Sequence, residues 1–212
     1  MAEKYKIIDL EQWNRKDHYT YFSKYDNPFF GIVTEIDCTN AYQTVKQKNE
    51  SFFAFYLHKS IVAANHIEEL KYRILEEKPV IYDVIHPSTT IARTDGTFGF
   101  AMISFIEDFK TFSEALQHEI KRVQTSKGLC IDENTYRKDV IHYSTFPWRK
   151  FTGLTHARSF NTDDSIPKIT FGKIYTNQER LLMPVSIDAH HSLLDGFHVA
   201  KYLDEFEQLL NK

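Results

Sequence analysis

The chain has 212 residues, of which 42% are hydrophobic and 15% aromatic, with 26 Lys and Arg against 29 Asp and Glu. This length and composition suit one domain over residues 1–212 with a sizeable core, and they argue against a disordered protein. The net charge of -3 does not favour binding to nucleic acid or to an anionic membrane. No apolar run approaches the roughly 18 residues of a membrane span.

The start of the chain and its cysteines indicate a compartment. Met1 is followed by a polar stretch rather than the apolar segment of a signal peptide. Cys38 and Cys130 are the only cysteines, and two thiols without a nearby partner are typical of reduced residues. We therefore expect a cytoplasmic protein.

Helices and strands are expected to alternate in the first half of the chain. Asp9 can cap a first helix that carries Leu10, Trp13, Arg15 and Tyr19. The elements expected next are a strand over 30–37, a short helix capped by Thr39 or Asn40, an apolar helix over 51–70, and strands over 72–75 and 80–84.

The second half continues this alternation. Thr-Asp-Gly-Thr at 94–97 is a hairpin signal between two strands. The elements expected after it are a helix over 108–123, strands over 140–144, 168–175 and 181–189, a hairpin through Asn177 and Gln178, and a closing helix over 195–210. The pattern predicts an α+β two-layer sandwich, in which helices cover one face of a mixed, mostly antiparallel sheet.

The segment His-His-Ser-Leu-Leu-Asp-Gly-Phe-His, residues 190–198, combines imidazoles with a carboxylate where a strand meets a helix. Alternation along the strand places His191 on the same side as Ala189, and His190 on the other. Asp195 can cap the final helix, and Gly196 permits a tight junction. The pattern predicts an imidazole and a carboxylate close together at a strand end.

Other interpretations of these residues stay open at this point. Either histidine can be a hydrogen-bonded structural residue, and Asp195 can be no more than a helix cap. A zinc site would need His190, His191 and His198 to converge, but adjacent strand residues point to opposite faces and no Cys or carboxylate has ligand spacing. We therefore expect no metal.

The same segment contains His-His-x-x-x-Asp-Gly, a signature of coenzyme A-dependent acyltransferases, and its longer form resembles the chloramphenicol acetyltransferase family. Three further blocks are similar to that family: Trp-Asn-Arg-Lys-Asp-His-Tyr at 13–19, Ser-Thr-Phe-Pro-Trp at 144–148, and Thr170 followed by Arg-Leu-Leu-Met-Pro-Val-Ser at 180–186. The resemblance runs from residue 5 to 211. It implies the family's two-layer α/β sandwich, assembled as a homotrimer with active sites between subunits.

The resemblance also implies a role for each matching residue. His191 would be the general base that takes the proton of a substrate hydroxyl as the oxygen attacks the thioester of acetyl-CoA, without an acyl-enzyme. Ser144 would donate to the oxyanion, and Thr170 would hold a water near it. Asp195 would pair with Arg15 rather than act as a triad acid.

Other positions concern the two substrates. The resemblance places Trp148 against coenzyme A, and it places four phenylalanines in the acceptor pocket: Phe22, Phe30, Phe98 and Phe100. Without the resemblance, Ser144 would be a turn serine, Thr170 an ordinary strand residue and Trp148 a core aromatic.

The match to the family departs mostly around the acceptor pocket. Phe22 replaces a Tyr and Phe100 a small residue, whereas Phe30 and Phe98 agree. Further departures are Pro28, His142, Asp188 and Ala189, where the family carries Cys, Asn, Gln and a larger aliphatic. These changes would reshape the acceptor site without touching the base, and a lost hydroxyl can change which acceptor is chosen.

Four hypotheses follow. The first is O-acetylation of chloramphenicol by acetyl-CoA in a homotrimer without nucleic-acid or membrane partners, and the second is acyl transfer to another small hydroxylated acceptor. The third is a dihydrolipoamide acyltransferase core. We expect this one less, because no lipoyl or subunit-binding segment precedes the domain. The fourth is a non-catalytic protein that binds coenzyme A or another ligand, although His191, Ser144, Asp195 and Arg15 together argue against it.

Overall fold

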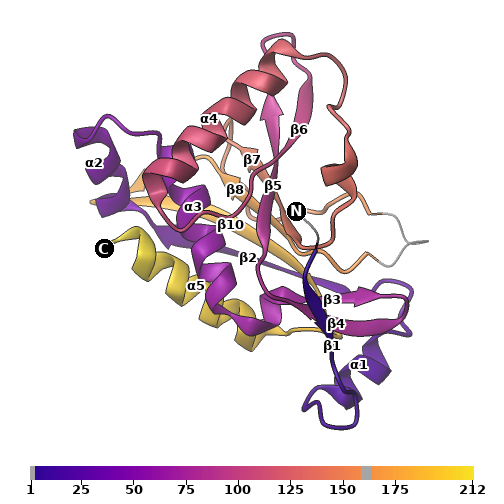
Figure 1. Cartoon of the computed structure of the whole chain (residues 1–212). Coiled ribbons are helices and arrows are strands. Elements are labelled where there is room, and N and C mark those ends of the chain that lie inside the picture. Colours follow the sequence, from indigo (N-terminus) through magenta and orange to yellow (C-terminus); the bar gives the residue numbers. More distant parts are fainter. Residues whose placement is uncertain (1–2, 159–163) are drawn as a thin grey trace.

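A computed structural model describes residues 3–158 and 164–212 (Figure 1). Its elements run in the order β1 (Tyr5–Ile7), α1 (Lys16–Phe22), β2 (Phe29–Asp37), α2 (Thr39–Gln47), α3 (Phe52–His66), η1 (Glu68–Lys71), β3 (Tyr72–Leu75), β4 (Lys78–Tyr82), β5 (His86–Ala92), β6 (Phe98–Met102), α4 (Phe109–Thr125), η2 (Glu133–Tyr136), β7 (Val140–Phe146), β8 (Lys168–Gly172), β9 (Tyr175–Asn177), β10 (Arg180–His190) and α5 (Gly196–Leu210).

The main sheet has the strand order β2-β10-β8-β7-β5-β6, with β9 paired to β10. The pairs β5–β7 and β7–β8 are parallel, and the other pairs of this sheet are antiparallel. Parallel neighbours need a connection of a dozen or more residues, which residues 93–139, including β6, and residues 147–167 provide. A second sheet, β1-β4-β3, is antiparallel throughout. The predicted mixed, mostly antiparallel arrangement is confirmed.

Three helices, α3, α4 and α5, lie together over one face of the main sheet (Figure 1). Odd-numbered residues of the central strands face them: Val185, Ile187 and Ala189 of β10 are fully buried. From β7, the Tyr143 hydroxyl lies 2.9 Å from the Ser60 hydroxyl of α3. Even-numbered residues of the same strands therefore point to the opposite face, and among them Ser88, His142 and Ser144 line the larger of the two cavities described below.

The first helix begins at Lys16, so the predicted start at Asp9 is wrong. The Asp9 carboxylate accepts the Glu11 backbone N–H at 3.0 Å and closes a turn instead of a helix. Trp13 packs edge-on against Tyr72 of β3, with ring centroids 5.3 Å apart, so a tertiary contact holds the turn that precedes the helix.

Other boundaries also differ from the expectation. The apolar helix ends at His66 rather than Leu70, because Ile67 is extended and a 3-10 turn follows. The short strand β1 and the 3-10 turn η2 were not expected, since three residues paired only to a distant strand leave little periodic signal.

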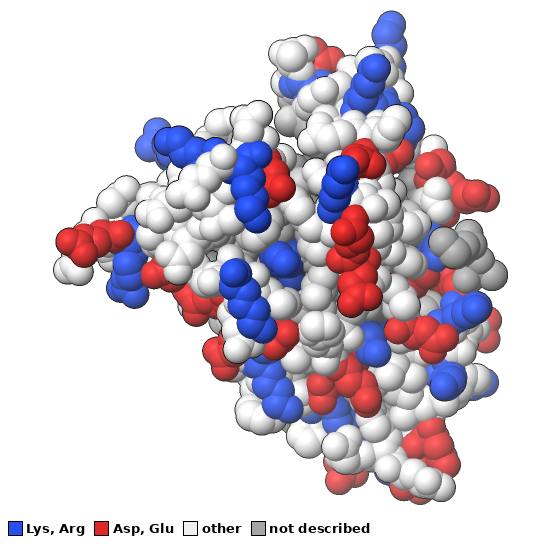
Figure 2. All heavy atoms as spheres, turned by 60° about the vertical axis from the view of Figure 1, so that its left-hand side comes forward, with Lys and Arg blue, Asp and Glu red and all other residues white. Residues whose placement is uncertain are grey.

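The outer surface carries charges of both signs. Figure 2 shows Lys and Arg interspersed with Asp and Glu on the face in view, an arrangement that keeps the local potential low there. Among the described residues, no helix is both long and apolar enough to cross a bilayer.

Candidate functional site

His191 lies one residue beyond the end of β10, in the turn that leads to α5. Its backbone N–H donates to the Pro28 carbonyl at 2.8 Å. Its ring stacks on Phe22 of α1 with centroids 4.1 Å apart and planes 11° apart, and it lies 4.7 Å from the Phe30 ring of β2. Its Nδ1 is buried without a hydrogen-bond partner among the described residues. Aromatic packing, rather than a carboxylate, therefore orients this imidazole.

Arg15 and Asp195 meet as the resemblance implies. Arg15 Nη1 donates to Asp195 Oδ2 at 2.9 Å, and the Arg15 side chain is 7% exposed. Arg15 Nη2 also donates to the His191 backbone carbonyl at 3.3 Å. The guanidinium therefore connects the segment before α1 with both the turn of His191 and the start of α5.

The Asp195 carboxylate caps α5 by accepting the Phe197 backbone N–H at 3.0 Å. Partial burial would raise the pKa of Asp195, but the hydrogen bond from Arg15 and the positive charges of His198 and Arg15 outweigh it and hold the pKa below its usual value. This carboxylate contacts Arg15 and the helix N-terminus, which is the arrangement of a structural residue rather than of a triad acid.

The two other histidines of the motif have separate partners. His190 is buried, its Nδ1 lies 2.7 Å from the Ser192 hydroxyl, and burial lowers its pKa to about 4, so it is neutral at pH 7. His198 lies beside Asp195 and Glu69, at 2.9 and 3.3 Å. The three imidazoles do not converge, and the described part of the chain contains no group of three or more His, Cys, Asp or Glu arranged to hold a metal.

Ser144 and Thr170 are direct neighbours on β7 and β8, and Thr170 in turn faces Ser186 of β10. All three point away from the helices. The Ser144 hydroxyl makes no hydrogen bond to another described residue, which leaves it free to donate to a ligand. Thr170 Oγ1 lies 3.4 Å from Nε2 of His156, a residue that no sequence motif had indicated and that only the tertiary structure places here.

Ser144 and His191 are far apart within one chain. Two strand spacings of about 4.8 Å separate Ser144 from Ser186, and five residue steps of about 3.4 Å lead from Ser186 to His191, a distance of roughly 20 Å in all. A single subunit therefore does not bring the expected base to the expected oxyanion donor.

The expected pocket residues fall into two groups. Phe22 and Phe30 lie against His191, whereas Phe98 and Phe100 line a cavity of about 390 Å³ that also includes Ser144. We call it the acceptor cavity after the role expected of Phe98 and Phe100, and the other residues that line it are Ser88, Thr89, Thr90, Thr135, His142, Tyr143, His156, Ala157 and Lys168.

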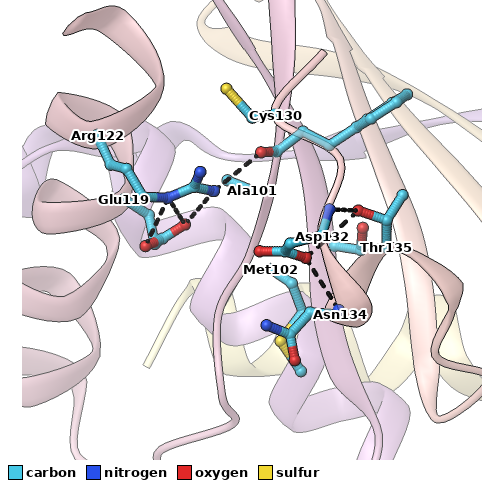
Figure 3. Close-up of a pocket in the computed structure, with 10 residues that line it drawn as sticks. Ala101, Met102, Glu119, Arg122, Cys130, Asp132, Asn134 and Thr135 are labelled. Atoms are coloured by element: carbon cyan, nitrogen blue, oxygen red, sulfur yellow. Dashed lines mark hydrogen bonds and ion pairs between the residues drawn. The ribbon is translucent and has the colours of Figure 1, made fainter. Parts of the chain in front are cut away.

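A second cavity of about 180 Å³ adjoins the first and shares Ser88, Phe100 and Thr135 with it. Figure 3 shows Glu119 and Arg122 of α4 on one side of it, and Asp132, next to η2, on the other. Arg122 pairs with Glu119 at 2.8 Å, while Asp132 accepts the Asn134 backbone N–H at 2.9 Å.

Trp148 lies on the surface just beyond β7, 65% exposed, with Phe146 edge-on at 5.6 Å between centroids. It is not a core aromatic. Arg149 and Lys150 follow it and are also exposed. Both cysteines carry free thiols, Cys38 buried and Cys130 half-buried, and burial raises the pKa of Cys38 to about 12.

Comparisons with known proteins give a consistent result. The family model described as "Chloramphenicol acetyltransferase" matches residues 3–207. A chloramphenicol acetyltransferase of Proteus mirabilis is 27% identical over 203 residues, which cover 95% of this chain and 93% of that protein. One of Clostridium perfringens is 25% identical over 209 residues, covering 98% and 99%.

Solved structures agree on the fold. A chloramphenicol acetyltransferase superposes with a TM-score of 0.91 at 30% identity and covers 98% of this chain and 100% of its own. A probable dihydrolipoamide acetyltransferase from Listeria monocytogenes superposes with a TM-score of 0.67 at 15% identity, covering 92% and 88%. The second likeness concerns the fold alone.

Proposed function

This chain belongs to the chloramphenicol acetyltransferase family, and we propose that it moves the acetyl group of acetyl-CoA to a hydroxyl of chloramphenicol. One observation supports this most: the chain carries an imidazole fixed by aromatic packing and an unpartnered hydroxyl beside a cavity. A base and an oxyanion donor are what direct acyl transfer requires.

The proposed reaction is a direct attack in a ternary complex. The acceptor oxygen bonds to the thioester carbon while neutral His191 takes the hydroxyl proton. The carbonyl oxygen becomes an oxyanion, which accepts a hydrogen bond from Ser144, and Thr170 holds a water beside it. The carbon–sulfur bond then breaks, the proton passes from His191 to the thiolate, and the products are the acetate ester and free coenzyme A.

The proposed assembly is a homotrimer in which His191 of one subunit serves Ser144 of the next. The roughly 20 Å that separate these residues within one chain support this arrangement, because base and oxyanion donor must both touch the reacting carbon. The Phe22 and Phe30 group would then close the acceptor cavity from the neighbouring subunit.

Mixed oligomers test this assembly. His191→Ala and Ser144→Ala subunits, each inactive alone, are unfolded together, mixed in equal amounts and refolded. If each active site lies between two subunits, random mixing restores about a quarter of the wild-type number of active sites. If each active site lies within one chain, mixing restores none. Separately refolded variants, mixed only afterwards, are the control. No recovery in the co-refolded sample, despite a trimeric mass, would contradict the shared site.

Acetyl-CoA is proposed to lie along Trp148. An exposed indole offers a stacking surface, and Arg149 and Lys150 next to it offer positive charge for phosphates. The described residues include no assembled metal site, and the proposed reaction uses none.

Thiol release from acetyl-CoA in the presence of chloramphenicol is the direct test of activity. We expect release by the wild type and its loss in His191→Ala. Release with another alcohol but not with chloramphenicol would favour the second candidate, a different hydroxylated acceptor, which the polar lining of the cavity supports. Coenzyme A binding without release, for every acceptor tried, would instead indicate a binding protein.

A further inference from the structure

The floor of the acceptor cavity carries two rows of polar side chains across the sheet. In one row, Ser144 pairs with Thr170, and continuing the Thr89–Tyr143 pairing by one residue places Thr90 of β5 beside Ser144; of these, Thr90 and Ser144 line the cavity. In the neighbouring row, Ser88 pairs with His142, and His142 with Lys168. Because the members of both rows are even-numbered residues of their strands, they share the face away from the helices.

The row Ser88–His142–Lys168 has unused hydrogen-bonding capacity. Neither the Ser88 hydroxyl nor the His142 ring makes a hydrogen bond to another described residue. Lys168 Nζ donates once at short range, to the Ala157 carbonyl at 2.7 Å, out of three N–H groups. All three side chains line the cavity, so three adjacent hydrogen-bond donors face the space where the substrate that receives the acetyl group would lie.

The charges around Lys168 leave this ammonium only weakly paired. Asp164 and Asp188 are both held by Arg158, at 2.9 and 2.5 Å, and Lys168 Nζ is 3.8 Å from Asp164. Among the described residues, no carboxylate lines the acceptor cavity. The second cavity differs, because the carboxylates of Glu119 and Asp132 line it, and Arg122 beside them is paired with Glu119. Of the two cavities, the acceptor cavity is therefore the one that presents an ammonium group and, among the described residues, no carboxylate.

Resting on the proposed acetyl transfer, we propose that the acceptor site favours hydroxyl compounds that bear a carboxylate over matched neutral alcohols, the carboxylate being bound by Ser88, His142 and Lys168. His142 and Ser144 are two residues apart on β7, about 7 Å along the strand, which places the carboxylate a few bonds from the reacting hydroxyl. Lys168 is then a specificity-determining residue. The aromatic pair Phe98 and Phe100 would accommodate an apolar body.

A matched pair of acceptors tests this. Tropate and 2-phenylpropane-1,3-diol share a phenyl group and a primary alcohol, and they differ in a carboxylate against a second hydroxymethyl group. We expect wild-type kcat/KM to favour tropate by about tenfold to a hundredfold, the range of a charge-assisted contact. Lys168→Met should abolish that preference and Lys168→Arg should keep most of it. Lys121→Met, at an exposed position of α4 outside the cavity, is the control and should leave the ratio unchanged.

Four results would count against the inference or its premise. Equal use of both alcohols by the wild type, or a tropate preference that survives Lys168→Met, overturns the role of Lys168 while leaving acetyl transfer intact. Acetylation of chloramphenicol with no turnover of either alcohol does the same. No thiol release with any of the three acceptors overturns the proposed function itself. Diol turnover by Lys168→Met reports that this variant is folded.

Discussion

Replacing Asp195 by Asn should destabilise the protein while sparing the helix cap. The amide can still accept the Phe197 N–H, since Asn and Asp cap about equally well. It cannot neutralise Arg15, whose side chain is 7% exposed. Breaking a fully buried pair costs about 3–5 kcal/mol, and because the Asp195 side chain is 28% exposed we expect about 2 kcal/mol. Asp195→Ala also loses the cap and should cost about 1 kcal/mol more.

Urea unfolding at a fixed subunit concentration measures these differences, because oligomerisation makes apparent stability concentration-dependent. A double-mutant cycle with Arg15→Met isolates the pair and should give a coupling of about 1–2 kcal/mol. Activity should fall as well, since Arg15 also holds the His191 carbonyl. The reasoning is refuted if Asp195→Asn keeps wild-type stability and kcat, or if the cycle shows no coupling.

The pair also predicts a pH dependence. The folded state lowers the pKa of Asp195, so its contribution to stability is complete above the unfolded value of about 3.9 and is lost as the pH falls through the folded value. Asp195→Asn should therefore reduce the acid sensitivity of the unfolding free energy below about pH 4. If the unfolding free energies of the wild type and the variant fall equally as the pH drops below about 4, this prediction is contradicted.

Three further predictions concern the proposed chemistry. His191→Ala should lower kcat by about 10²–10⁴ with coenzyme A binding unchanged, measured by thiol release and calorimetry, and a loss below tenfold would exclude it as the base. Ser144→Ala should lower kcat by about 10²–10³ with little change in KM, and a change confined to KM would make Ser144 a binding residue instead. Trp148→Ala should raise the KM for acetyl-CoA by about tenfold, whereas Trp148→Phe should keep the KM close to the wild-type value. An unchanged KM in Trp148→Ala would place the cosubstrate elsewhere.

The periodicity of the sequence was a good guide where one face of an element is buried. The closing helix was expected over 195–210 and forms over Gly196–Leu210 with Asp195 as its cap. The strand leading to the histidine pair was expected over 181–189 and extends over Arg180–His190. Side-chain alternation is a local property, so burial of one face is visible in the residue pattern.

Local pattern was a poor guide to boundaries that depend on distant contacts. The turn around Asp9 has the residues of a helix start, but Trp13 packs on Tyr72 and the helix begins only at Lys16. Strand β1 exists because Tyr5 pairs with Tyr82, more than seventy residues away. Neither partner is apparent from the residues around these positions.

The sequence by itself determined the motif of His191, the cap of Asp195 and the family to which the chain belongs, because these depend on residue identity and short spacing. Only the tertiary structure decided which residues share a site. It gathers Ser88, His142 and Lys168 from three strands into one row, and it keeps Ser144 far from His191. Strand order and register set these distances, and both result from long-range pairing that no local pattern encodes.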